Sequence, residues 1–324
     1  KRSFLGVTAQ GVCANDVKKS VIFFQQINPA KVDGAFLQET IFNLIHDFGI
    51  EQNFNGIISD NAGNLISAFD NEVFHRKCCL AHTLNLIIKD IHLLFKDKMD
   101  ILDQVRMKTK NSSIFSKICQ TLNCPISKLP SYSETRWYSL YNLIHNFNIS
   151  IDCIKYLYSE KNCQIPFSDD DVQFFQEFEI FLKYIKEAIE LFESEKFGQI
   201  SKAFFELHSM KDSVMRFVEN SLFLHQKAED IKSSIESRIQ MIYSSWGNVI
   251  YAAALLNPDP MYSEYLTEEQ RNLGKEYIEL FMEENNANVE SVKTAETSSQ
   301  RDYIYNHEIN MNCQRNELET FLSF

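Results

Sequence analysis

Short apolar runs alternate with turn-forming residues over the first sixty positions of the chain. Residues 4–9 and 21–24 are rich in β-branched and aromatic side chains and are separated by turn formers, which predicts two paired strands. Residues 35–48 place apolar side chains three and four positions apart, a pattern typical of a helix. Residues 57–59 are too few for a helix and end at the turn formers 60–64, so we expect a third strand there.

Beyond residue 79 the apolar positions recur at helical spacing. The helix that begins at Cys79 is expected to bury one stripe of side chains, namely Leu84, Ile87, Ile88, Ile91 and Phe95. Further helices are predicted at 99–122 with an interruption at 111–113, and at 140–159, 168–192, 198–218, 224–245 and 247–256. The pattern as a whole predicts an α/β chain with a large helical part.

Composition narrows the class of protein. The 324 residues are 44% hydrophobic and 13% aromatic, enough to bury the cores of about two domains. No stretch of about eighteen apolar residues occurs, so we expect no membrane span. The eight cysteines are scattered apart from Cys78 and Cys79, which favours reduced thiols in the nucleus or cytosol over a disulfide framework. Because the chain begins with Lys1, we expect it to be a piece of a longer protein.

Charge is distributed unevenly along the chain. The formal net charge of -12 argues against a nucleic-acid-binding protein. Between Arg76 and Arg136, however, eleven Lys and Arg stand against five Asp and Glu, a net charge of +6 that leaves -18 for the remainder. This basic excess predicts either a surface that faces DNA or a solvated helix face.

Asp60 directly follows the strand predicted at 57–59. In open α/β sheets, ligands and metals gather beyond the strand ends, so a carboxylate placed there can hold a divalent cation in a fixed position. Asp60 is therefore a candidate catalytic and metal-binding residue. The alternative is a structural role, in which Asp60 caps the helix beginning near Leu65 or makes an Asx turn.

Cys79 and His82 lie one helical turn apart at the start of the next helix. As zinc ligands they would need two more partners, and the sequence offers only His75 and Cys78 nearby, with no second Cys-x-x-Cys pair. We therefore expect no zinc at this position and interpret Cys79 and His82 as a packed, hydrogen-bonded structural pair near the site.

Three motifs occur in a fixed order: Ser-Asp-Asn-Ala-Gly-Asn at 59–64, Cys-Leu-Ala-His-Thr-Leu-Asn-Leu at 79–86 and Glu-Thr-Arg-Trp-Tyr-Ser at 134–139. In this order and spacing they resemble the catalytic core of the hAT superfamily of cut-and-paste DNA transposases. The resemblance covers residues 3–160 well and the rest weakly.

The resemblance implies a domain organisation. Residues 1–159 would form a ribonuclease H-like mixed sheet with its first strand absent, and residues 160–282 would be the all-α insertion that interrupts this sheet. The composition of residues 283–315 predicts a flexible linker. Residues 316–324 resemble the start of a C-terminal dimerisation helix, which implies that the protein forms a homo-oligomer. The resemblance to DNA transposases also implies that the protein acts in the nucleus.

The resemblance also assigns roles within the site. Asp60 would be the second of three catalytic carboxylates that bind Mg²⁺ or Mn²⁺; the first would precede Lys1 and the third would follow Phe324, since Glu317 and Glu319 lie in a different motif. Trp137 would stack on a base displaced from the duplex, and Arg136 would contact a phosphate. The structural alternatives are a core aromatic residue for Trp137 and a salt bridge with Glu134 for Arg136.

The resemblance thus implies a transposase core that binds DNA at transposon ends and, in the complete protein, cleaves and transfers strands with divalent metal ions. Two ions need more than one carboxylate, so the present span alone is expected to be inactive. A domesticated, non-catalytic descendant that binds DNA and dimerises is the alternative, favoured by Asn257 and by residues 31–34, which depart from the family pattern. A helical scaffold unrelated to nucleic acid is the third interpretation.

Overall fold

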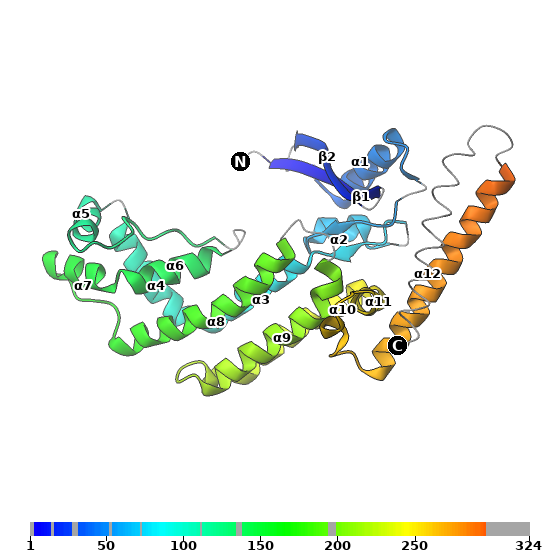
Figure 1. Cartoon of the computed structure of the whole chain (residues 1–324). Coiled ribbons are helices and arrows are strands. Elements are labelled where there is room, and N and C mark those ends of the chain that lie inside the picture. Colours follow the sequence, from blue (N-terminus) through cyan, green and yellow to red (C-terminus); the bar gives the residue numbers. More distant parts are fainter. Residues whose placement is uncertain are drawn as a thin grey trace.

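The structure is a computed structural model that describes residues 3–13, 16–27, 32–51, 54–71, 73–110, 112–133, 138–193 and 199–295. Helices make up most of these residues, and two small sheets lie near the N-terminus (Figure 1). The α/β prediction with a large helical part is confirmed. Within the described ranges, no helix combines the length and apolar character that crossing a bilayer requires.

The first two strands form an antiparallel hairpin. β1 (Ser3–Cys13) pairs with β2 (Asp16–Ile27), and the register shifts once, between Val7 and Thr8. Both strands were predicted, although each is longer than its apolar run because the backbone pairing continues through the polar residues next to the turn.

A helix and a second sheet follow the hairpin. α1 (Gly34–Asp47) begins at Asp33, whose carboxylate accepts the amide of Phe36 at 2.9 Å. β3 (Ile58–Ser59) leads into α2 (Gly63–Phe69), and β4 (Lys77–Cys78) pairs with β3 in parallel. The β3 strand was predicted. β4 was not, because two residues are too few to show a period.

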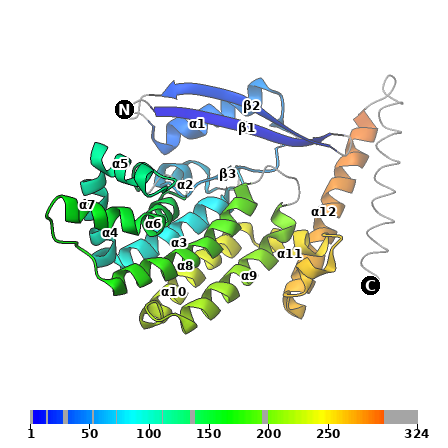
Figure 2. The same ribbon diagram turned by 60° about the vertical axis from the view of Figure 1, so that its left-hand side comes forward.

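These elements share a small core, which we name the strand-region cluster. Its fully buried members come from α1, α2 and the turn before β4, and they are Leu37, Ile41, Ala68, Phe69 and Phe74. Leu5 and Val7 of β1 and Ile57 beside β3 pack against it, so both sheets contact one core. Figure 2 shows β1 on the side of the hairpin nearer to β3.

The helical region contains α3 to α12. Their bounds are α3 (Leu80–Leu94), α4 (Lys96–Thr109), α5 (Ser113–Thr121), α6 (Ser139–Ile149), α7 (Ile151–Glu160), α8 (Asp169–Glu193), α9 (Gln199–Asn220), α10 (Ala228–Trp246), α11 (Asn248–Leu255) and α12 (Glu268–Ala295). The predicted apolar stripe of α3 is buried at every position, from Leu84 to Phe95. The helices predicted between residues 79 and 256 are therefore confirmed, including the interruption expected at 111–113, and one of them is divided unexpectedly at residue 150.

The division at residue 150 has a local cause. The hydroxyl of Ser150 donates to the carbonyl of Asn146 at 2.6 Å, and such a bond back to the preceding turn bends a helix. The continuous helix predicted over 140–159 is therefore two helices, α6 and α7.

One hydrophobic core, the helical cluster, runs from Cys78 to Ile278. It crosses the boundary expected at residues 159 and 160, because α3 packs against both α8 and α10. Asp90 on α3 also forms a two-pronged ion pair with Arg238 on α10, at 2.8 and 3.0 Å. The two predicted domains thus share a core in the helical region.

At the C-terminal side, α12 continues to Ala295, so residues 283–295 are helical where composition predicted a linker. The N-terminal half of α12 packs closely on α11, with Gly274 against Leu255 and Ala252. Once a helix has formed and is held by packing, each further residue that becomes helical gains one backbone hydrogen bond. The helix can therefore continue into a segment with few apolar residues. The rest of the predicted linker and the predicted helix at 316–324 lie outside the described residues.

Candidate functional site

Asp60 lies at the end of β3, as predicted. Its Oδ1 accepts the backbone amide of Ala62 at 2.8 Å, which makes an Asx turn immediately before α2. This is the structural role named as the alternative. The Oδ2 atom accepts no hydrogen bond from the part of the chain that the structure describes, and the side chain is half-buried. The turn therefore orients the carboxylate and leaves one of its oxygens available.

Arg76 holds the backbone around Asp60. Its Nε donates to the hydroxyl of Ser59 at 2.8 Å, and its Nη2 donates to the carbonyl of Asp60 and to Oδ1 of Asn61, both at 2.7 Å. The guanidinium thus binds three successive residues through neutral oxygens and makes no ion pair with the Asp60 carboxylate. Its role here is to position the strand end.

The residues around Asp60 also bond directly to the start of α3. The amide of Cys79 donates to the carbonyl of Ser59 at 2.8 Å, and Nδ2 of Asn61 donates to Oγ1 of Thr83 at 3.1 Å. The Thr83 hydroxyl in turn donates to the carbonyl of Cys79 at 2.9 Å. The segments at 59–64 and 79–86 therefore meet in space and form one polar network.

Cys79 sits at the N-terminus of α3, where it is half-buried. Burial raises the pKa of its thiol above the ordinary value, while the backbone amides of His82 and Ala81 act in the opposite direction. The backbone amide of His82 therefore lies near the Cys79 thiol, and the pairing of the two side chains stays a prediction. Neither residue belongs to a group of three or more metal-ligating side chains among the described residues.

The third motif falls largely outside the described residues, which exclude Glu134, Arg136 and Trp137. Its two ends are described. Ser133 and Ser139 bond reciprocally, the amide of Ser133 to the Ser139 hydroxyl at 3.2 Å and that hydroxyl to the Ser133 carbonyl at 2.7 Å. Both ends line a small crevice together with Asn85, Ile88 and Lys89 of α3. The two described ends of the motif therefore lie beside the same helix that begins next to Asp60.

Nine of the eleven basic residues between 76 and 136 divide into two groups, while Lys89 is half-buried and Arg136 lies outside the described residues. Those with structural partners bind oxygen, sulfur or an aromatic ring within the fold, and they are Arg76, Lys77, Lys98, Arg106 and Lys108. Those with exposed side chains are Lys96, Lys110, Lys117 and Lys128. The basic excess in the sequence thus contributes partly to the internal structure, and only the second group is placed to meet a large ligand.

The outer edge of β4 is covered by the end of α10, a contact that the sequence did not predict. The amide of Cys78 donates to the Ser245 hydroxyl at 2.7 Å, and the indole Nε1 of Trp246 donates to the carbonyl of Cys78 at 3.0 Å. The Lys77 ammonium reaches the carbonyl of Ser245 at 3.0 Å. These bonds attach the small sheet to the helical region.

A second feature missed from the sequence is a cluster of three thiols where α5 and the loop after it meet α7, formed by Cys119, Cys124 and Cys153. Burial raises the pKa of Cys119 to about 12, with the neighbouring thiols adding to the shift. The Cys-x-x-x-x-Cys spacing of the first two was a visible signal, but Cys153 is remote in sequence.

In comparisons with known proteins, no family model and no curated protein matched the chain.

Proposed function

We propose that this chain is a DNA-binding core related to the hAT transposases, in which Asp60 is a carboxylate for a divalent metal ion. The observation that carries the proposal is the network joining residues 59–64 to 79–86, because it brings two of the three resembling motifs into contact at a strand end. The two ends of the third motif bond to each other through Ser133 and Ser139 and line a crevice together with Asn85 of α3, which supports a common site.

The proposed fold is a ribonuclease H-like sheet of which β1–β2 and β3–β4 are the two flanks. Within the described ranges, β1 pairs with β2 alone and β3 with β4 alone, while both contact the strand-region cluster. The side chain of Ile58 in β3 is 62% exposed, unusual for an isoleucine in a strand. A strand placed between β1 and β3 would join the flanks and cover Ile58.

This arrangement has its own test. When the chain is extended upstream of Lys1, the amide of Ile58 should exchange its hydrogen more slowly. The reason is that this amide would donate a hydrogen bond to a carbonyl of the added strand. Hydrogen exchange followed by mass spectrometry resolves this segment, and the amides of α8 serve as an internal reference. Unchanged exchange at Ile58 would remove the sheet from the proposal.

Metal chemistry would require Asp60 together with further carboxylates. Mg²⁺ and Mn²⁺ prefer carboxylate oxygens, and Oδ2 of Asp60 is the oxygen available for one. In the complete protein, two ions would activate the attacking water or hydroxyl and stabilise the leaving oxygen of a phosphodiester. Asp60 alone cannot hold two ions, so this chain is proposed to bind DNA in the nucleus without cutting it.

A substitution separates the two roles of Asp60. Asp60→Asn keeps an oxygen for the Ala62 amide and removes the charge, so the fold should be retained while Mn²⁺ binding is lost. Electron paramagnetic resonance of Mn²⁺ added to a chain extended to include the further carboxylates measures the loss, with Asp70→Asn, an exposed acid after α2, as the matched control. Equal Mn²⁺ binding by Asp60→Asn and the unchanged chain would contradict the metal role.

The DNA contacts would come from the exposed lysines Lys96, Lys110, Lys117 and Lys128, with Arg136 and Trp137 adding a phosphate contact and base stacking. Binding that rests on phosphate contacts weakens as salt rises. Fluorescence anisotropy with a labelled duplex should show weak, salt-sensitive affinity and a smaller salt slope for the triple variant Lys110→Ala, Lys117→Ala, Lys128→Ala.

The matched control removes the same charge elsewhere. Lys183, Lys227 and Lys275 are exposed on α8, before α10 and on α12, and their triple alanine variant should bind as the unchanged chain does. If both triple variants lose affinity equally, binding reflects net charge and not the proposed surface. Absence of binding at low salt would exclude the DNA-binding function.

A non-catalytic descendant that binds DNA and dimerises is the second candidate. Asn257, which departs from the family's Leu-Asp-Pro pattern, is buried and donates through Nδ2 to the hydroxyl of Ser201 at 2.8 Å. Its Oδ1 accepts the amide of Asp259 at 3.0 Å. Asn257 therefore holds the loop between α11 and α12 in place. A structural role at this position fits a chain that retains the fold for DNA binding without catalysis.

A further inference from the structure

Cys119 and Cys124 are brought together by the way α5 ends. Asn123 adopts a left-handed conformation with φ 53°, and the amides of Asn123 and Cys124 donate to the carbonyls of Gln120 and Cys119. This pair of bonds defines a Schellman motif, which folds the chain back over the last turn of the helix. Cys124 is therefore placed beside Cys119.

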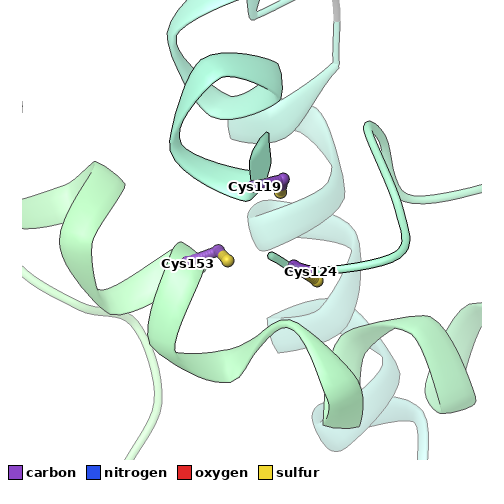
Figure 3. Close-up of side chains that lie close together, drawn as sticks. All are labelled: Cys119, Cys124 and Cys153. Carbon is purple, nitrogen blue, oxygen red and sulfur yellow. The ribbon is translucent and has the colours of Figure 1, made fainter. Parts of the chain in front are cut away.

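Cys153 completes the cluster from the first turn of α7, which packs against α5. The three sulfur atoms lie within 4.8 Å of one another. Figure 3 shows the side chains around a common space, one from α5, one from the loop after it and one from α7. Cys119 and Cys153 are 1% and 2% exposed and Cys124 is half-buried, so the cluster reaches solvent on the Cys124 side.

Cys163 provides an internal comparison. It follows α7 in a second Schellman motif, in which Asn162 has φ 49° and the Cys163 amide donates to the carbonyl of Tyr158. Its sulfur contacts the ammonium of Lys108 at 3.1 Å and belongs to no group of metal-ligating side chains among the described residues. A cysteine after a left-handed asparagine is thus a helix ending used twice, and the convergence of three thiols is particular to the first.

We propose that Cys119, Cys124 and Cys153 form a three-thiolate site for a soft d¹⁰ cation, Zn²⁺ or Cu⁺. Thiolates are the side-chain ligands that such ions prefer. Bonds of about 2.3 Å from metal to sulfur place the sulfurs of a tetrahedral site about 3.8 Å apart, which fits within the present cluster. Each thiol that binds releases its proton to solvent.

The two ions differ in what completes the site. Zn²⁺ would take a fourth ligand, a water molecule, on the side where Cys124 reaches solvent. Cu⁺ is satisfied by three sulfur ligands in a plane. Either ion would join α5, a helix of nine residues, to α7 and to the loop that leads to residues 134–139. The site is independent of DNA binding and would fix the local packing.

Metal titration of the reduced chain under anaerobic conditions tests the proposal. Competition against a chromophoric chelator should give one Zn²⁺ or one Cu⁺ bound per chain, and Co²⁺ as a probe should show sulfur-to-metal charge-transfer bands. The relative affinities for Zn²⁺ and Cu⁺ identify the ion. Cys124→Ser should weaken binding by at least about tenfold, since even indirect partners of metal ligands have effects of this size.

Controls keep the result interpretable. Cys163→Ser should leave the affinity and the charge-transfer bands unchanged, and circular dichroism should show that both variants are folded. Cys153→Ser provides the second ligand variant. Three outcomes would overturn the proposal: no ion bound by the unchanged chain, binding that survives both ligand variants, or a Cys119–Cys124 or Cys119–Cys153 disulfide in freshly prepared protein, as found by alkylation and mass spectrometry.

Discussion

The strand region and the helical region of this chain differ in how much core each possesses. Among the described residues, most of the fully buried phenylalanines lie in the helical cluster, whereas Phe69 and Phe74 belong to the strand-region cluster. Asp60 follows a strand that contacts the smaller core, and the network around it reaches the start of α3 in the helical cluster. The strand region therefore depends on bonds to its neighbour, and the candidate site is placed where the fold is least self-sufficient.

This difference matters for function because a metal-binding carboxylate needs a fixed position. In the strand region that position comes from hydrogen bonds, chiefly those of Arg76, and from the attachment of β4 to α10. In the helical region, position follows mainly from the packing of the larger core. Perturbing each region separately shows whether the two are distinct cooperative units.

The largest effect is expected from Phe178→Ala in the helical region. Phe178 is fully buried on α8 and its ring packs against those of Phe95, Phe174 and Phe181 at 5.4 to 5.6 Å. The cavity should reduce the free energy of unfolding by about 3–5 kcal/mol, measured by urea denaturation. Ile180→Ala, exposed on the same helix, is the control and should change it by about 0.5 kcal/mol or less.

Phe74→Ala should have a smaller effect that is confined to the strand region. The Phe74 ring packs edge-on against Phe69 at 5.2 Å and Phe54 at 6.2 Å. We expect a local loss of about 3 kcal/mol, seen as faster hydrogen exchange in α1 and α2 while α8 is unchanged. Val73→Ala is the exposed neighbour for comparison. Equal acceleration in α8 would show that the two regions unfold together.

Acid should weaken the helical region through Asp171. Burial raises the pKa of this carboxyl, but the bonds from Lys98 at 2.6 Å and from Ser168 outweigh it, so the pKa is below the ordinary value. Its stabilising contribution is therefore present above the unfolded pKa and is lost as pH falls through the folded one. Asp171→Asn should cost about 2 kcal/mol at pH 7, and the difference should shrink below about pH 4 in urea denaturation.

The sequence accounts for the elements of both regions better than for their attachment. The apolar stripe of α3 was readable because five side chains recur at helical steps, and the β1–β2 hairpin because turn formers separate its apolar runs. β4 escaped prediction because its pairing, and not its two residues, makes it a strand.

Long-range contacts are the remainder that sequence reasoning missed. Nothing near Arg76 indicates that it binds Ser59 and Asn61, and nothing near Ser245 indicates that it meets Cys78. The thiol cluster has the same character, since Cys153 joins it through the packing of α7 on α5. Such contacts depend on tertiary structure, which local periodicity does not encode.

The smallest effect is expected at the attachment itself. Ser245→Ala removes the oxygen that accepts the Cys78 amide at 2.7 Å, and the loss should be about 1 kcal/mol. Hydrogen exchange at Cys78 should become faster without a change in α8. Ser244→Ala, on the exposed neighbour of Ser245, provides the control and should leave the Cys78 amide unaffected. Unaltered exchange in both variants would mean that Trp246 suffices to hold β4.

The hydrogen bonds with Ser245 and Trp246 that cover the outer edge of β4 also affect association between copies of the chain in solution. Exposed strand edges invite pairing between chains and hence aggregation. On the β4 side that route is blocked by side chains of the same polypeptide. An incoming strand would instead meet the edge of β3 at Ile58, close to Asp60. Such a strand could come from a neighbouring molecule or from elsewhere in the same one.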